Sequence, residues 1–177
     1  MALPDYFIRT QGTAIVWGEN GASGVTHVLS LNNLANGAAR SGVYADLGAN
    51  IPDAYLVFLV METGATAPTA GLTYEVYLVS SHDASVWPAK LNGTDASYTP
   101  GSNDINLRQA GSPAAVLVAT ADANTVLRQA PMVWYPRGRY VQPILYNRSG
   151  QALANKTPAS DNASRIIMIP FNSSVVD

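Results

Sequence analysis

The sequence predicts an all-β protein, an antiparallel β-sandwich for which a jelly roll is the expected form, with one long irregular loop. Short runs rich in Val, Ile, Leu and aromatic residues recur along the chain, and turn-forming Gly, Pro, Asn and Asp separate them. No stretch carries the spacing of an amphipathic helix or of a repeat protein. With 177 residues, 47% of them hydrophobic, the chain can bury one good core, so residues 1–177 are expected to form a single domain.

Counting the apolar runs gives eight or nine strands, which is typical of a sandwich or a jelly roll. The runs span residues 13–17, 25–31, 40–47, 54–61, 72–79, 114–120, 125–134, 139–147 and 164–171. Pro143 and Pro170 lie within the last two of these runs. Because proline has no amide hydrogen to donate to a neighbouring strand, these positions are expected at sheet edges or bulges.

The run at residues 54–61 is apolar at every position. A strand of this kind is expected to have both faces covered, as a central strand of a packed sheet does. Leu56, Phe58 and Val60 are therefore predicted to belong to the core, and Phe58→Ala is expected to unfold the protein.

The run at residues 72–79 alternates instead. Leu72, Tyr74, Val76 and Leu78 share one face of the expected strand, and the polar residues between them share the other. The first face is predicted to enter the core, and the second to meet water or a partner.

From about residue 80 to 113 the periodicity disappears, and Gly, Ser, Asn, Asp and Pro dominate. Irregular segments of this length inside a compact domain are commonly functional or interfacial. Trp87, Leu91 and Tyr98 lie within it and are the candidate interface residues. Two alternatives stay open: this segment is an arm that docks on a neighbouring subunit, or it folds back over the domain's own core.

Charged residues make up only 12% of the chain, and the net charge is −2. Ten dispersed Lys and Arg residues are not the clustered cations that bind nucleic acid, and a weakly charged surface suits a homo-oligomer or a subunit covered by neighbours. Arg137-Gly138-Arg139, the densest basic stretch, is interpreted as a turn between two strands. Neither a signal peptide nor a membrane span is expected, because the N-terminus lacks an apolar core and the apolar runs are short.

Chemical signatures are sparse. The chain has no cysteine, and of its two histidines His27 is expected to pack on a strand face, while His82 beside Asp83 has no third partner at the spacing of a metal or catalytic site. Glu62 and Glu75 are a conceivable carboxylate pair, because only the fold decides whether two carboxylates meet. We expect no catalytic residues, no metal and no cofactor.

Four segments carry a resemblance to known proteins. They are residues 1–7 (MALPDYF), 31–49 (beginning LNNLANGAAR), 68–78 (PTAGLTYEVYL) and 139–150 (RYVQPILYNRSG). Together they resemble small structural proteins of tailed bacteriophages. The resemblance implies a virion location after synthesis in the host cytoplasm, and a role as a capsid decoration (cement) protein or an accessory subunit. It also implies contacts with the major capsid protein or with neighbouring head or tail proteins, and it supplies no active-site residues.

Two other function classes remain open. Trp17, Trp87, Trp134 and nine tyrosines are compatible with a carbohydrate-binding β-sandwich on a phage tail or fibre, because sugar rings stack on exposed aromatic side chains. Trp17 and Trp134 lie in strand-like runs, where packing in the core is the expected role. A hydrolase is the third class.

Overall fold

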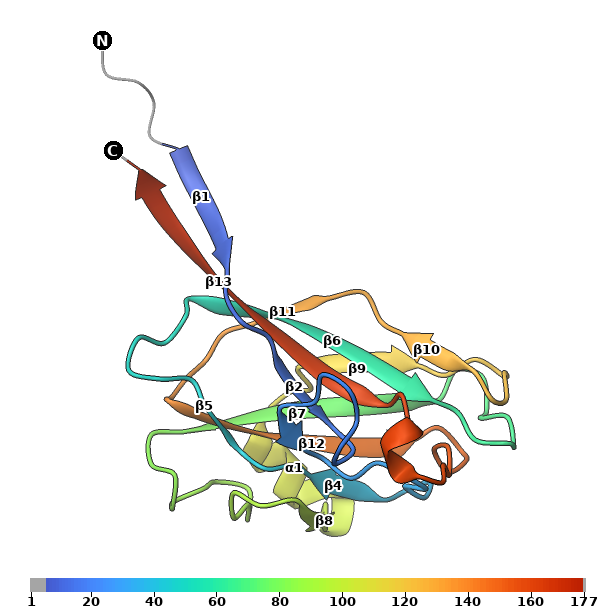
Figure 1. Cartoon of the computed structure of the whole chain (residues 1–177). Helices are drawn as coiled ribbons and strands as arrows, with labels where there is room; N and C mark the ends of the chain where they lie inside the picture. The colour runs from blue at the N-terminus through green and yellow to red at the C-terminus, as the bar shows by residue number, and fades with distance from the viewer. Residues whose placement is uncertain (1–5, 177) are drawn as a thin grey trace.

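The computed structural model describes the backbone of residues 6–176 and the side chains of residues 12–171. Two β-sheets pack face to face, which confirms the all-β sandwich, and thirteen strands are the main regular elements of this part of the chain (Figure 1). One short α-helix, α1 (Ile105–Ala110), lies in the segment where the sequence predicted only irregular structure. Two single-turn 3-10 helices, η1 (Ser102–Asp104) and η2 (Ala159–Asp161), complete the elements.

We call the larger sheet sheet A. Its strands are β1 (Tyr6–Gln11), β2 (Ile15–Gly18), β3 (His27–Val28), β6 (Ala54–Glu62), β10 (Val126–Arg128), β11 (Met132–Trp134) and β13 (Arg165–Val176). The strand order is β10-β6-β13-β2-β3, with β11 also on β6 and β1 also on β13. Every pair is antiparallel except β2 with β3.

We call the second sheet sheet B. Its strands are β4 (Ala39–Ser41), β5 (Ala45–Asp46), β7 (Thr73–Ser81), β8 (Ala96–Tyr98), β9 (Ala115–Val118) and β12 (Tyr140–Arg148). The order is β8-β4-β12-β7-β9, with β5 also on β12, and every pair is antiparallel. Neighbours in both sheets are mostly distant in the sequence, so each sheet is completed by strands from both halves of the chain.

The main core fills the space between the sheets. Its large side chains include Trp17, Tyr55, Val57, Leu59 and Met61 from sheet A, and Tyr74, Val76, Leu78, Val141 and Leu145 from sheet B. Tyr74, Val76 and Leu78 were predicted to be buried and are. The prediction was wrong for Leu72, which precedes β7 and is 41% exposed.

The prediction for residues 54–61 was wrong. In β6 only Tyr55, Val57, Leu59 and Met61 face the core, whereas the alternate side chains point away from sheet B and are partly exposed. A run that is apolar at every position indicates that both faces of a strand avoid water, but the chain itself covers only one of them.

A second, smaller core lies on the other side of sheet B. It contains Ala39, Tyr77, Val79, Leu91, Tyr98, Leu107 and Ile144, with Trp87, Ala110 and Tyr146 packed against it. The irregular segment therefore folds over the outer face of sheet B, and α1 contributes Leu107 to the contact. This is why the non-core face of β7, predicted to be wet or to touch a partner, is buried by the chain's own segment.

Both strand prolines lie inside the sheets, opposite breaks in a neighbouring strand. The carbonyl of Pro143 accepts a hydrogen bond from Gly42, between β4 and β5, and that of Pro170 accepts one from Gly12, between β1 and β2. In a strand, the backbone nitrogen and carbonyl of one residue point toward the same neighbouring strand. The nitrogen of each proline therefore points to the place where that neighbouring strand is interrupted, so its missing hydrogen breaks no regular ladder. The physical reason for the prediction was right, although the positions are neither edges nor simple bulges.

The first and last strands form a ribbon that leaves the body of the protein. β1 pairs antiparallel with the C-terminal half of β13, from Tyr6 opposite Val176 to Gln11 opposite Phe171. Figure 1 shows this two-stranded ribbon projecting beyond the sandwich, while the N-terminal half of β13 lies within sheet A between β6 and β2.

Candidate interaction surfaces

The three candidate interface residues lie in the second core. Leu91 and Tyr98 are only 9% and 8% exposed, and the Tyr98 hydroxyl donates a hydrogen bond to the carbonyl of Ala89 at 2.8 Å. Trp87 is half-buried, with its indole N–H bonded to the carbonyl of Ala84 and its ring 5.8 Å from that of Tyr44. This arrangement matches the alternative in which the segment folds over the domain's own sheet, while a contact of these residues with a neighbouring subunit stays a prediction.

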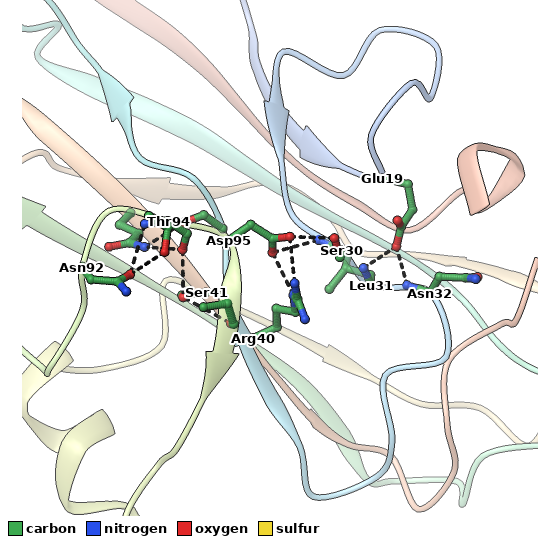
Figure 2. A network of polar contacts seen from close by, with 12 residues as sticks. Glu19, Ser30, Leu31, Asn32, Arg40, Ser41, Asn92, Thr94 and Asp95 are labelled. Atoms are coloured by element: carbon green, nitrogen blue, oxygen red, sulfur yellow. Dashed lines mark hydrogen bonds and ion pairs between the residues drawn. The ribbon is translucent and has the colours of Figure 1, made fainter. Parts of the chain in front are cut away.

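A polar network also fixes this segment to the sandwich, through Asp95, which lies between Leu91 and Tyr98 (Figure 2). The carboxylate of Asp95 accepts two hydrogen bonds from the Arg40 guanidinium, both 2.8 Å, and two more from the backbone N–H and hydroxyl of Ser30. Burial alone would raise the pKa of the Asp95 carboxyl, but the bonds from Arg40 and Ser30 outweigh it and hold that pKa below its ordinary value. The Asp95 carboxylate is therefore charged at neutral pH, and both of its oxygens accept hydrogen bonds from Arg40 and Ser30.

Gln142 continues this network in the interior. Its fully buried amide donates to the carbonyls of Gly42 and Thr94 and accepts from the backbone N–H of Gly93. Nearby, the buried carboxylate of Glu19 accepts bonds from two consecutive backbone N–H groups of the turn that follows β3. Figure 2 shows the Asp95 carboxylate directed at Arg40 and Ser30, and the Glu19 carboxylate directed at the backbone of Leu31 and Asn32. These polar groups therefore already have hydrogen-bond partners within the chain.

The titratable residues considered for chemistry are not brought together. His27 lies in β3, 5.7 Å from the ring of Trp17, and burial lowers its pKa. The Asp83 carboxylate accepts hydrogen bonds from the N–H and the hydroxyl of Ser85, which lower its pKa. His82 beside it is exposed. Among the side chains that the structure describes, no group of three or more His, Cys, Asp or Glu residues is placed to hold a metal ion.

The two candidate carboxylates of a hydrolase lie on different sheets. Glu62, at the end of β6, bonds Lys156 at 2.6 Å and the backbone N–H of Ala163. Glu75, in β7, accepts a bond from the Tyr77 hydroxyl and faces Arg148. Each carboxylate has its own partners.

The outer face of sheet A is an apolar surface that the described part of the chain leaves partly exposed. Its side chains form three rows that run across the strands. The end row contains Val133, Leu56 and Ile169, and the central row contains Phe58, Ile167 and Val16. The basic row contains Arg128, Val60 and Arg165. All nine side chains are partly or fully exposed, Val133 at 49%. In a strand with one face in water, buried apolar residues alternate with exposed polar residues. On this face, however, all six residues of the end and central rows are apolar.

The chain matches no family model, no curated protein and no solved structure. Within the described residues, no helix is long and apolar enough to cross a membrane. The sequence signal for the outer face was the unbroken apolar run of β6, which was interpreted as a strand covered on both sides. The structure shows that the second cover is not supplied by the described part of this chain.

A groove opens between the two sheets at one side of the sandwich. It has a volume of about 410 Å³ and is lined by β11, the end of β7 and the C-terminal end of α1. Trp134 is half-buried and packs against the core, with its ring 6.0 Å from that of Tyr55, while the neighbouring Tyr135 is 67% exposed. Of the three tryptophans, Trp17 is fully buried, Trp87 packs against the second core, and Trp134 lines this opening.

Proposed function

We propose that the chain is a structural subunit of a tailed-phage virion, a capsid decoration (cement) protein or an accessory head or tail subunit, held by protein–protein contacts. One observation carries the proposal: the chain buries the outer face of sheet B under its own segment but leaves the apolar outer face of sheet A uncovered. A contiguous apolar patch of this kind is typical of a surface that another protein covers.

Two further features support an assembly role. Only 12% of the residues are charged, which gives little electrostatic protection against association. The terminal ribbon also presents two strand edges outside the sandwich. A two-stranded ribbon is marginally stable by itself in water and its free edges are templates for pairing, so its geometry favours a ribbon that is held by a neighbour.

The strand order supports a jelly-roll interpretation. Along the chain, β2 leads to β4, β6 to β7, β9 to β10 and β12 to β13, and each of these steps passes from one sheet to the other. The strands in these steps, β2, β6, β10 and β13 of sheet A and β4, β7, β9 and β12 of sheet B, alternate as in two Greek keys rolled together, and viral capsid and lectin domains use this fold. A fold of this kind hosts many functions, so the argument for assembly rests on the uncovered face.

The direct test is occupancy on particles. Purified chain is mixed with phage particles that lack it, and the mixture is sedimented through a cushion. Wild-type chain is expected in the pellet at a fixed ratio to the major capsid protein. Val133→Asp, on the outer face of sheet A, is expected to reduce occupancy at least tenfold.

Val118→Asp is the matched control. Val118 is 55% exposed, similar to Val133 at 49%, but lies in β9 at the edge of sheet B. It should bind as the wild type does. Wild-type chain that never sediments with particles would contradict the proposal.

The groove favours a second candidate, a carbohydrate-binding module. The exposed ring of Tyr135 and the indole of Trp134 line one side, with Arg137 and Gln109 as polar groups that can bond hydroxyls. Binding to a glycan array that is lost in Tyr135→Ala, without a change in melting temperature, would favour this function over assembly.

A further inference from the structure

We propose that the basic row of the outer face of sheet A binds a carboxylate of a partner protein, carried on an α-helical segment whose apolar side chains cover the central and end rows. This inference rests on the proposed function in treating the face as an interface, and it states the chemistry of the occupant. It follows from two arginines without acidic partners that lie beside two apolar rows.

Arg128 and Arg165 are the two charged residues of the three rows, and they flank Val60. Arg128 is exposed and has no ion pair within the described residues. The Arg165 guanidinium donates to the backbone carbonyls of Ala163 and Ser23, at 3.1 and 3.4 Å, which fixes its position without neutralising its charge. The face therefore presents two positive charges that the described part of the chain leaves uncompensated.

Both arginines line an open hollow on this face. Its volume is about 320 Å³, and its lining consists of Val60, Val126, Arg128, Ala163, Arg165 and Ile167. The Cα atoms of the two arginines are two strand spacings apart, roughly 9.6 Å, so an anion placed over Val60 lies between the two guanidinium groups. Glu62, the one acidic residue of β6, does not supply this anion, because Lys156 and the N–H of Ala163 bind its carboxylate.

The composition of the face distinguishes between classes of anionic partner. Nucleic acid is bound by several clustered cations that follow its phosphates, whereas this face offers two arginines and six apolar side chains. A protein segment that carries both a carboxylate and apolar residues complements both parts of the face. Four strands about 4.8 Å apart and three rows about 6.7 Å apart give roughly 300 Å² of projected surface. Such an area suits one segment of a partner, because whole domains in stable complexes bury about 800 Å² each.

The backbone of the bound segment also needs hydrogen-bond partners. β6 and β13 have neighbouring strands on both sides within sheet A, so a chain that lies on their outer face cannot pair with them. An α-helix bonds its own backbone, and about nine helical residues span the roughly 13 Å from the basic row to the end row. The carboxylate therefore belongs at one end of the apolar stripe of the helix.

A designed peptide tests the carboxylate and the arginines together. The probe is an Ala-rich helical peptide with one Glu in its first turn and Leu residues about four, eight and eleven positions later, and the comparison peptide has Gln in place of that Glu. NMR titration of the full chain should show at least fivefold tighter binding of the Glu peptide, with shifts at the amides of β6 and β13. The double variant Arg128→Gln/Arg165→Gln should bind both peptides equally.

Arg108→Gln is the matched control, since Arg108 is an exposed arginine of α1 that has no ion pair within the described residues. It should keep the full preference for the Glu peptide. Arg128→Gln alone, at an exposed position, should reduce that preference at least twofold, which keeps the test available if the double variant is unstable. A preference that persists unchanged in a folded double variant would overturn the inference.

Occupancy on particles separates this inference from the proposed function. The double variant is expected to occupy particles at least fivefold less than the wild type. Full occupancy of the double variant, under conditions in which Val133→Asp does not bind, would overturn the inference and keep the proposed function. The expected peptide preference, without occupancy of the wild type on particles, would leave the inference standing while the proposed function fails. Tighter binding of a single-stranded oligonucleotide than of the Glu peptide, lost in the double variant, would assign the arginines to phosphate and overturn the inference.

Discussion

Leu59 and Leu56 lie in the same strand and point to opposite faces of sheet A, so replacing each with alanine measures what the two faces contribute. Leu59 is fully buried in the main core, and Leu56 lies in the end row of the outer face. The two substitutions delete the same atoms. The difference between their effects therefore reports burial and cavity formation alone.

We expect Leu59→Ala to lower the free energy of unfolding by about 3 to 5 kcal/mol, since it loses the transfer free energy of the side chain and leaves a cavity. Leu56→Ala should cost about 1 kcal/mol, because its side chain is already partly in water and solvent fills the space. For a domain of this length, 1 kcal/mol corresponds to roughly 2–4 °C, so the melting temperature should fall by about 6–20 °C in Leu59→Ala and about 2–4 °C in Leu56→Ala.

Thermal unfolding followed by circular dichroism provides the measurement. It should be made at a protein concentration low enough to keep the chain monomeric, because Leu56 lies on the uncovered apolar face of sheet A. Equal losses in the two variants, or a larger loss in Leu56→Ala, would show that the assignment of the two faces is mistaken.

Four further predictions concern other parts of the fold. Asp95→Asn should cost about 2 kcal/mol at neutral pH, because it leaves Arg40 without its carboxylate. Because the pKa of Asp95 is lowered in the folded state, the carboxylate contributes to the free energy of unfolding above the unfolded pKa of about 3.9. This contribution is lost as pH falls through the folded pKa. The unfolding curves of Asp95→Asn and wild type should therefore converge in acid. Gly138→Ala should lower the melting temperature, since an added Cβ would lie 2.5 Å from the Ser81 carbonyl oxygen, and a retained melting temperature would contradict that close approach. Tyr98→Ala should likewise destabilise the domain, measured by urea unfolding, because the ring fills the second core; unchanged stability would favour a docking role for this residue instead. EDTA should change neither melting temperature nor assembly, and a stoichiometric ion found by elemental analysis would argue against this.

Alternation was the part of the sequence that predicted structure best. The 72–79 run alternates strictly, and its Tyr74, Val76 and Leu78 face the core as expected. The turn at Arg137-Gly138-Arg139 connects β11 to β12, also as expected. Both depend on neighbours in the sequence, where local periodicity and turn chemistry are informative.

Features that depend on distant contacts were not predictable. The run at 25–31 is a strand only at His27–Val28. After it, the backbone N–H groups of Leu31 and Asn32 bond to the carboxylate of Glu19 instead of to a neighbouring strand. Helix α1 is six residues long, too short to display a helical period. The direction of Phe58 could not be known either, because a wholly apolar run gives no sign of which face a single chain covers.

The position of β13 has a consequence for how the protein is made. This strand comes after all its neighbours along the chain, yet it lies between β6 and β2 in the middle of sheet A, and its far half is the partner of β1. While the chain emerges from a ribosome, the strand that pairs with both β2 and β6 has not yet been synthesised. Their apolar side chains therefore stay exposed until β13 is translated. Sheet A can therefore close only after β13 has been translated, a pairing order that makes folding slow and leaves the nascent chain open to aggregation.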